Sequence, residues 1–348
     1  MTNTRARAAV YGASGYGGAE LLRLLSGHPA IEVVAVGAES NAGAPVTDLF
    51  PALAAQYGGR FYGASEPALG DGCDVAFLAL PHGASQGLVP DLIDRVPHVV
   101  DLAADFRLPA DMYEQWYGHA HKAPELLDRF AFGLVELERP VIEAAQHVAV
   151  PGCYPTAASL ALAPLLADGA VEPTGIVVDA LSGVSGAGRA LKITSHFSEV
   201  NENASAYGLL THRHTAEMEL ALTHVAGTDV RVLFTPHLVP MTRGILATCY
   251  ARPAHEGLTT KALLEQYRDY YEGEACVIVT DEPSGTRSTY GANTAHVTVR
   301  ADERTGTVLA IAAIDNMVKG AAGQAVQNTN ILLGLPETTG LPLVGLAP

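Results

Sequence analysis

The stretch RARAAVYGASGYGGAELLRLLSGHP, residues 5–29, decides the fold of the first part of the chain. It predicts a short apolar strand over 8–11, then a glycine turn, then a helix with its leucines facing inward. The turn carries Gly12, Gly15 and Gly18 in a GxxGxxG spacing. A glycine turn between a strand and a helix lets backbone N–H groups approach a pyrophosphate at the helix N-terminus. We therefore expect a dinucleotide site here. A plain glycine turn is the alternative, because the spacing departs from GxGxxG.

Strands and helices continue to alternate up to about residue 152. Apolar strands are predicted at 31–36, within 74–83 and within 98–105, and a helix is predicted at 84–95. Such alternation is typical of an α/β fold with a Rossmann-like, doubly wound parallel sheet.

The pattern changes after residue 152, where apolar strands follow one another with few helices between them. This predicts an α+β domain with a mixed or antiparallel sheet. Near the end, one long helix is predicted over 315–334. We expect a dinucleotide-binding domain at 1–152, completed by the C-terminal helix 315–348, and a catalytic, substrate-binding and oligomerisation domain at 153–314.

Composition narrows the class of partner. The chain of 348 residues is long enough for two domains, and its net charge of −16 argues against nucleic acid and anionic membranes. Four widely spaced cysteines without a CxxC pair predict neither disulfides nor a metal site. The N-terminus lacks a signal peptide's apolar core, and no apolar run approaches the ~18 residues of a membrane span. We expect a cytoplasmic protein with a small-molecule ligand.

One cysteine stands at a chemically favourable place. In VAVPGCYPTAASLAL, residues 148–162, Cys153 follows a predicted buried strand and a Pro-Gly turn, and it precedes a predicted helix that becomes apolar after Pro155. Free backbone N–H groups and the positive end of a helix dipole favour a thiolate there. Cys153 is therefore a candidate nucleophile, and a buried structural cysteine is the alternative.

Two histidines and two arginine-bearing loops are further candidates. His212 and His214 are either an acid/base partner for the thiol, a solvated or core pair, or a metal site that lacks an obvious third ligand. The loop SGVSGAGRALK at 182–192 is either an anion cradle or a surface loop. Arg107 stands just past the end of a parallel strand, where open α/β sheets bind ligands, although a surface arginine is the plain alternative.

The coenzyme preference stays open at this level. Glu39 follows the second strand, where an acidic residue of an NAD site would bond the ribose hydroxyls. Ser40 and Asn41 beside it have groups that donate to a 2′-phosphate, and no arginine stands in this stretch.

Taken together, a dinucleotide domain, a thiol at a helix N-terminus and a histidine are the machinery for reducing an acyl group to an aldehyde. The stretches that carry a family resemblance run in order through nearly the whole chain: GASGYGGAELLRLL at 12–25, PGCYPT at 151–156, SGVSGAGR at 182–189 and HRHTAEME at 212–219. They resemble the N-acetyl-gamma-glutamyl-phosphate reductase family of arginine biosynthesis, which is related to aspartate-semialdehyde dehydrogenase.

The resemblance implies NADPH as reductant, an acyl-phosphate substrate, a semialdehyde product and a homodimer or homotetramer. It implies Cys153 as the nucleophile and His212 as the acid/base. The substrate-binding candidates are Arg107, Ser182, Arg189 and His214. The cofactor-binding candidates are Gly12, Ser14, Gly15, Tyr16, Gly17, Ser40, Pro81, His82, Gly183 and Asn316.

Other acyl phosphates, such as aspartyl phosphate or a carrier-linked glutamyl or aminoadipyl phosphate, are alternative substrates. A non-catalytic dinucleotide sensor is the alternative from a different class. The cysteine at the helix start opposes it, because a sensor needs no nucleophile.

Overall fold

The computed structural model describes residues 5–60, 62–63 and 66–346. It divides into two compact units, one of Met1–Pro151 with Ala321–Leu341 and one of Gly152–Gly320 with Pro342–Pro348.

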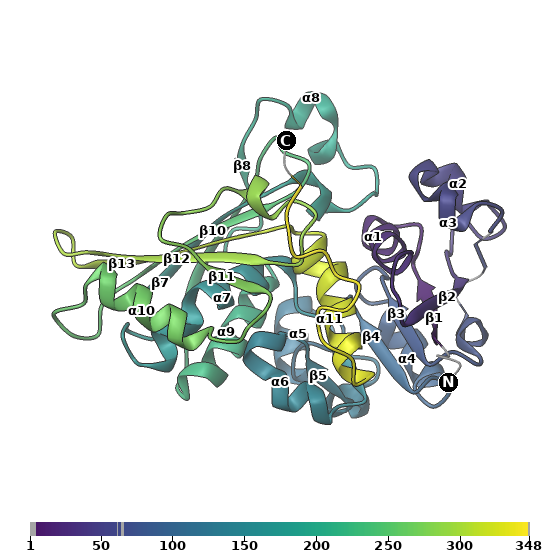
Figure 1. Cartoon of the computed structure of the whole chain (residues 1–348), viewed down its shortest axis with the longest axis horizontal. Coiled ribbons are helices and arrows are strands. Elements are labelled where there is room, and N and C mark those ends of the chain that lie inside the picture. The colour runs from purple at the N-terminus through teal and green to yellow at the C-terminus, as the bar shows by residue number, and fades with distance from the viewer. Residues whose placement is uncertain (1–4, 61, 64–65, 347–348) are drawn as a thin grey trace. The chain divides into compact units, whose positions relative to one another are not determined.

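The first unit is built on a six-stranded sheet with the order β2-β1-β3-β4-β6-β5 (Figure 1). Every ladder in this sheet is parallel, which confirms the predicted doubly wound architecture. Its strands are β1 (Ala6–Tyr11), β2 (Ile31–Val36), β3 (Val75–Leu78), β4 (His98–Asp101), β5 (Phe130–Phe132) and β6 (His147–Ala149). Its helices are α1 (Tyr16–Leu25), α2 (Val46–Leu49), α3 (Ala54–Tyr57), α4 (Ser85–Leu92), α5 (Ala110–Tyr117), α6 (Val135–Ala144) and α11 (Gly323–Leu332).

The sequence of the first strand and turn accounts for the sheet's start. Residues 8–11 are completely buried, as expected for a central parallel strand. Gly12 then turns the chain with φ +70°, and a Cβ there would stand 2.2 Å from the carbonyl oxygen of Ala79. A Cβ at Gly18 would lie 2.5 Å from Ala13 Cα, so α1 packs tightly on its own turn. Glycine is required at both positions for different reasons, a positive φ at Gly12 and close packing at Gly18.

The second unit is built on a seven-stranded sheet with the order β11-β12-β13-β10-β7-β9-β8. Four of its ladders are antiparallel and two, β11 with β12 and β7 with β9, are parallel, which confirms the predicted mixed sheet. Its strands are β7 (Ile176–Ser182), β8 (Ser205–Ala206), β9 (Val232–Leu238), β10 (Ile245–Ala251), β11 (Val277–Val279), β12 (Ala295–Asp302) and β13 (Thr307–Ile314). Its helices are α7 (Cys153–Ala167), α8 (Phe197–Val200), α9 (His214–Ala226) and α10 (Thr260–Tyr270).

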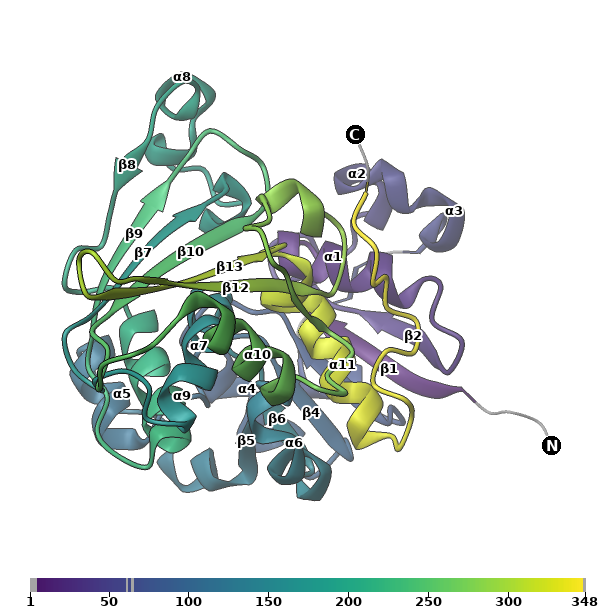
Figure 2. The same ribbon diagram turned by 60° about the vertical axis from the view of Figure 1, so that its left-hand side comes forward.

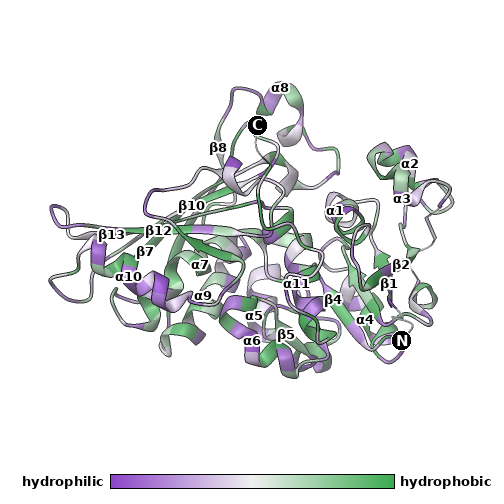
Figure 3. Ribbon diagram, viewed as in Figure 1, coloured by the Kyte–Doolittle hydropathy of each residue, from purple (hydrophilic) through white to green (hydrophobic). Residues whose placement is uncertain are grey.

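The helix α7 forms the centre of the second unit. Its residues 154–166 are all buried, and it packs against β10, β12 and β13 (Figure 2). The green colour of α7 in Figure 3 shows that it is apolar all round, as a helix buried on every side must be. The helices α9 and α10 lie with α7 on the same face of the sheet.

The chain near its C-terminus differs from the expected single helix. Instead of one helix over 315–334, a π-helical turn spans Val318–Ala322 and α11 follows at Gly323–Leu332. The start is delayed because the carboxylate of Asp315 accepts the N–H groups of Met317 at 2.8 Å and Val318 at 3.2 Å. A side chain thus caps the segment in place of a preceding helical turn.

The last residues group with the second unit, whereas the sequence pattern attaches all of 315–348 to the first. The Asn293 N–H donates to the carbonyl of Pro342 at 2.7 Å, and the Leu346 N–H donates to that of Tyr290 at 2.8 Å. These backbone bonds tie the tail to the segment before β12. Within the described part of the chain, no helix has both the length and the apolar character needed to cross a membrane.

Candidate active site

Cys153 is the first residue of α7, and Gly152 is its N-cap with extended φ/ψ. The helix therefore begins two residues before Pro155. The thiol is partly exposed and lies in the first turn of the helix. The backbone of Gly320 presses on this residue, since a Cβ at Gly320 would lie 2.7 Å from Cys153 Cβ. Cys153 thus has a fixed position at the positive end of a long helix dipole.

A buried carboxylate holds the residue before the thiol. The Gly152 N–H donates to Glu217 Oε2 at 2.8 Å, and Glu217 has no solvent-exposed area. The other oxygen of Glu217 lies 4.0 Å from Nε2 of His214. A Cβ at Gly152 would lie 2.4 Å from the same imidazole nitrogen, so His214 covers the turn in front of Cys153. Glu217 is a residue that sequence reasoning missed, although it lies one helical turn after His214.

His212 stands beside His214 within a ring of aromatic side chains. The two imidazole centroids are 4.8 Å apart. The rings of Tyr154, Tyr207 and Phe234 stand edge-on or tilted to His212 at 5.2–5.6 Å. The two histidines meet because His212 lies in the turn that leads into α9, not because an extended chain aligns them.

The protonation of His212 follows from this environment. Burial, reinforced by the neighbouring Arg213, lowers the pKa of His212 to about 4. The backbone N–H of His214 donates to Nδ1 of His212 at 3.2 Å, so the neutral ring carries its proton on Nε2. His212 is therefore a neutral hydrogen-bond donor at pH 7.

Two tyrosines complete this cluster. The hydroxyls of Tyr154 and Tyr207 are 2.9 Å apart. Burial raises the pKa of Tyr154 above its usual range and that of Tyr207 to about 12. Both phenols therefore stay protonated at neutral pH and supply donors next to the thiol.

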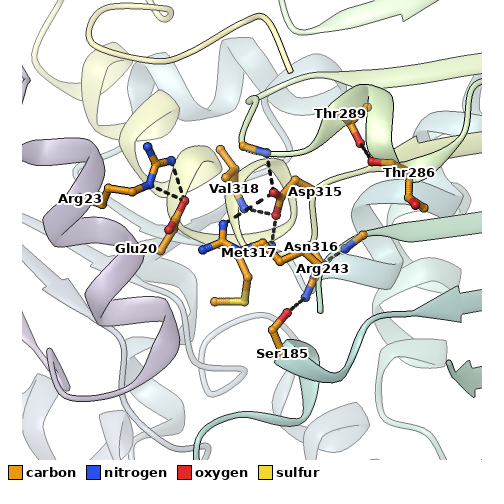
Figure 4. Close-up of polar contacts among 12 residues, drawn as sticks. Glu20, Arg23, Ser185, Arg243, Thr286, Thr289, Asp315, Asn316, Met317 and Val318 are labelled. Carbon is orange, nitrogen blue, oxygen red and sulfur yellow. Dashed lines mark hydrogen bonds and ion pairs between the residues drawn. The ribbon is translucent and has the colours of Figure 1, made fainter. Parts of the chain in front are cut away.

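The loop after β7 contains several predicted site residues. Ser182 is buried at the end of the strand, and Gly183 packs against the backbone of Thr242 and Arg243. Asn316 is buried and contacts this loop from another part of the chain. Its Oδ1 accepts the Gly244 N–H at 2.7 Å, and its Nδ2 donates to Ser185 Oγ at 3.0 Å (Figure 4). Arg189, the other predicted anion ligand of this loop, is exposed.

Most of the predicted nucleotide residues lie at the carboxyl end of the parallel sheet in the first unit, whereas Gly183 and Asn316 belong to the second unit. The N–H of Gly15, the N-cap of α1, donates to the Gly12 carbonyl at 3.0 Å. A Cβ at Gly17 would meet nothing within 4 Å, and Tyr16 is 40% exposed. The first N–H groups of a helix have no intrahelical acceptor. The turn from Gly12 through Ser14 to Gly17 thus offers donors on an open side, which fits a bound pyrophosphate.

The loops after β3 and β4 are bound to each other. His82, which follows Pro81, accepts the Ala104 N–H on Nδ1 at 3.1 Å, and Asp105 accepts the Gly83 N–H at 2.7 Å. Arg107 lies in the second of these loops. It is only 6% exposed, and its Nη2 donates to the carbonyl of Leu102 at 2.6 Å.

The same end of the sheet carries a buried acid that the sequence did not single out. Burial, reinforced by Asp105, raises the pKa of Asp101 to about 7. Its Oδ1 accepts the hydroxyl of Ser85 and the N–H of Ala103, both at 2.9 Å.

The stretch after β2 is open to solvent. Glu39 and Ser40 are both exposed, and Ser40 Oγ donates to Asn41 Oδ1 at 3.2 Å. An arginine does approach β2 from elsewhere in the chain, since Arg60 Nη1 donates to the Val34 carbonyl at 3.1 Å. It lines a cavity of about 390 Å³ together with Val36 and Gly63.

The predicted residues thus form two sets. Those expected to act chemically, Cys153, His212 and His214, lie together in the second unit, and most of those expected to hold the nucleotide lie together in the first. Across residues 5–60, 62–63 and 66–346, no three His, Cys, Asp or Glu side chains are grouped so that they could hold a metal ion.

Comparison with known families agrees with this division. A family described as semialdehyde dehydrogenase, NAD binding domain, matches residues 7–145. A second, described as semialdehyde dehydrogenase, dimerisation domain, matches residues 153–316.

Curated relatives resemble the chain over its whole length. The N-acetyl-gamma-glutamyl-phosphate reductase of Symbiobacterium thermophilum is 50% identical over 96% of this chain and 97% of its own. That of Thermus thermophilus is 49% identical over 97% of this chain and 99% of its own. That of Desulforamulus reducens is 46% identical over 97% and 99%.

Solved structures share the fold at low identity. Aspartate semialdehyde dehydrogenase II from Vibrio cholerae superposes with a TM-score of 0.71 at 17% identity, covering 95% of this chain and 99% of that one. The Candida albicans aspartate semialdehyde dehydrogenase solved with NADP gives 0.62 at 18% identity, with the same coverage.

Proposed function

Since the chain belongs to the N-acetyl-gamma-glutamyl-phosphate reductase family, we propose that it reduces N-acetyl-L-glutamyl 5-phosphate to N-acetyl-L-glutamate 5-semialdehyde and phosphate, a step of arginine biosynthesis. The observation that carries the proposal is the thiol of Cys153 at the start of α7, within the unit that also holds His212. A nucleophile and a hydrogen-bond donor to the reacting oxygen are what this route from acyl phosphate to aldehyde requires of the protein.

In the first step, Cys153 Sγ attacks the acyl carbon of the substrate. The carbon–oxygen bond to the phosphate breaks, inorganic phosphate leaves, and a thioester remains on Cys153. Backbone N–H groups at the start of α7 are in position to stabilise the oxyanion, an effect of about 3 kcal/mol for each donor. Arg107 is the proposed ligand of the substrate phosphate.

NADPH, when bound, supplies the hydride that reduces the thioester carbon. The Nε2–H of His212 is then the hydrogen-bond donor to the developing oxygen, and the carbon–sulfur bond breaks to release the aldehyde. Glu217 acts as a positioning residue, because it fixes the Gly152 N–H and lies beside His214.

The nucleotide is held by the glycine turn of the first unit in this proposal, with Gly12, Gly15 and Gly17 facing the pyrophosphate. Ser40 is the proposed ligand of the 2′-phosphate, and NADPH is the proposed reductant in preference to NADH. Gly183 and Asn316 are proposed to face the nicotinamide.

We also propose that the protein is a homodimer or a homotetramer in the cytoplasm, where its four cysteines stay reduced thiols. The helices α7, α9 and α10 cover one face of the seven-stranded sheet. The other face has a row of four apolar residues that are paired across β9, β7, β10 and β13: Leu233, Val177, Tyr250 and Leu309. Leu233 is 50% exposed and Tyr250 is 36% exposed. A second copy that covers this row removes its apolar surface from water.

The activity is tested most directly in the reverse direction, with N-acetylglutamate semialdehyde, phosphate and NADP, by absorbance of the reduced nicotinamide. Cys153→Ser should lose more than ~99% of the activity, because a hydroxyl is a far poorer nucleophile than a thiolate, while NADPH binding measured by fluorescence stays within twofold. Cys73→Ser, which changes a buried thiol of the first unit, is the control and should keep its activity. Retention of a tenth of wild-type kcat in Cys153→Ser contradicts the thioester route.

A further inference from the structure

A cavity of about 210 Å³ lies in the second unit, outside the cysteine and histidine cluster. Two arginines, a tyrosine and two threonines contribute most of its wall. The complete lining is Met241, Thr242, Arg243, Thr286, Arg287 and Tyr290. None of these residues has a role in the steps described above.

The strand register places this cavity at a defined end of the seven-stranded sheet. Ile245 is paired with Ser182 on one side and with Ile314 on the other, and Ile314 is paired with Ala295. These four paired residues form one row across the sheet, and Arg243 comes two residues before Ile245. Arg287 belongs to a 3₁₀ turn, Thr286–Thr289, in the segment that leads into the same row. The cavity therefore lies beside the loop after β7, whose Gly183 touches the backbone of Arg243.

The cavity carries a net positive charge. Arg243 Nη1 lies 3.6 Å from Asp315 Oδ2, and its guanidinium stands 5.8 Å from the centre of the Tyr290 ring. The Asp315 carboxylate already accepts three backbone N–H groups, from Gly291, Met317 and Val318, at 2.7–3.2 Å (Figure 4). Asp315 thus forms an ion pair with Arg243, which orients the guanidinium, while its carboxylate accepts hydrogen bonds from the backbone. Arg287 also lines the cavity, so the lining, among the residues that the structure describes, includes two guanidinium groups and no carboxylate, in a chain whose net charge is −16.

The same aspartate links the cavity to the nucleophile. The Gly320 N–H donates to the Asp315 carbonyl at 3.0 Å. A Cβ at Gly320 would touch Cys153 Cβ at 2.7 Å and Ile314 Cδ1 at 3.3 Å. One short segment, 314–320, therefore positions both Arg243 and the thiol.

We propose that Arg243 and Arg287 bind the α-carboxylate of the substrate while its acyl phosphate lies at Cys153. This inference rests on the proposed function, whose substrate carries a carboxylate on the same short chain as the reacting acyl carbon. Guanidinium groups bind carboxylates through paired, charge-assisted hydrogen bonds, and the Tyr290 ring offers an apolar wall for the adjoining carbon chain. The two arginines are thus specificity-determining residues.

The test compares N-acetylglutamate semialdehyde with its α-carboxamide, in the reverse reaction with phosphate and NADP. Arg287→Met should lower kcat/KM for the acid about 10- to 100-fold and leave that for the amide within twofold. Arg243→Met should do the same, and Arg243→Lys should recover part of the loss because the charge remains. The KM values for NADP and phosphate should stay within twofold. Arg304→Met, at the exposed tip of the β12–β13 hairpin, is the control.

Arg287 is the safer position, because it is exposed, whereas Arg243 also pairs with buried Asp315. Equal losses with acid and amide in Arg287→Met overturn the inference. A rise in KM confined to NADP or to phosphate also overturns it, and assigns the cavity to that group instead. If the wild-type enzyme turns over the acid and the variants keep its preference for acid over amide, the subsite is refuted while the proposed function stands. If the wild-type enzyme does not turn over the acid, the proposed function fails, and the subsite fails with it.

Discussion

The role proposed for His212 depends on the charge state of its imidazole. Because burial lowers the pKa of His212 to about 4, the ring is neutral throughout the physiological range. We expect His212→Asn to lower kcat about 100- to 1,000-fold, the usual range for loss of one preorganised hydrogen-bond donor to a developing oxyanion. The wild-type profile of kcat/KM against pH should show no limb from this residue between pH 6 and 7, and its acid limb should fall near pH 4. Steady-state kinetics from pH 3 to 9 measure both expectations.

Stability provides a second readout of the same residue. A histidine whose folded pKa lies below its unfolded value of about 6.5 contributes stability that is present above pH 6.5 and is lost as the pH falls toward 4. The fall in Tm from pH 7 to pH 5 should therefore be smaller for His212→Asn than for the wild-type protein. His224→Asn, an exposed histidine of α9, should leave kinetics and melting unchanged. A limb between pH 6 and 7 that disappears in His212→Asn contradicts a neutral imidazole.

Among the elements, the π-helical turn Val318–Ala322 has the clearest connection to the chemistry. Its Gly320 leaves no room for a side chain, because a Cβ would stand 2.7 Å from Cys153 Cβ and 3.2 Å from its Cα. Gly320→Ala should displace the first turn of α7 and lower kcat at least ~10-fold, since small misplacements of reacting groups are costly. Its Tm should fall by several degrees, as for other overpacked sites. Kinetics, melting and the rate of Cys153 alkylation by iodoacetamide measure these effects.

The matched control for this substitution is Gly87→Ala in α4. A Cβ at Gly87 would meet nothing within 4 Å, and the position is helical. Alanine there should raise stability slightly, because it reduces the freedom of the unfolded chain. Wild-type kinetics and alkylation in Gly320→Ala are the result that speaks against a positioning role for the turn.

At the scale of the whole molecule, the proposed assembly is tested at the partly exposed row of Leu233, Val177, Tyr250 and Leu309. Leu233→Glu combined with Tyr250→Glu should place charges in the middle of the proposed dimer interface and convert the dimer to a monomer, because buried unpaired charges are costly. Size-exclusion chromatography with light scattering measures the mass. Val141→Glu, at a 52%-exposed position of α6 in the first unit, should leave the mass unchanged. An unchanged mass in the double variant contradicts assembly through this face.

Local signals in the sequence are enough to predict much of this protein. The glycine turn at 12–18 requires a close approach of backbone, and the alternation of strands and helices on either side implies a parallel sheet. Ile31–Val36 is a strand at the predicted residues. The Pro-Gly turn before Cys153 predicts the start of a helix. The residues next to Cys153 in the sequence were therefore enough to predict a thiol at a helix N-terminus. Each of these features depends on residues a few positions apart.

Contacts between distant residues decided the rest. The Gly152 N–H meets Glu217 across 65 residues, Arg243 meets Asp315 across 72, and Gly320 closes on Cys153. Nothing in the local pattern marks these pairs, because strand register and helix packing bring them together. The pKa of His212 is likewise set by burial, which becomes known only when the surrounding rings are in place. The sequence by itself determined most of the elements and the place of Cys153 at a helix start, whereas tertiary structure decided the buried carboxylate of Glu217, the proton's location on His212 and the arginine cavity, since these depend on which distant residues share a desolvated space.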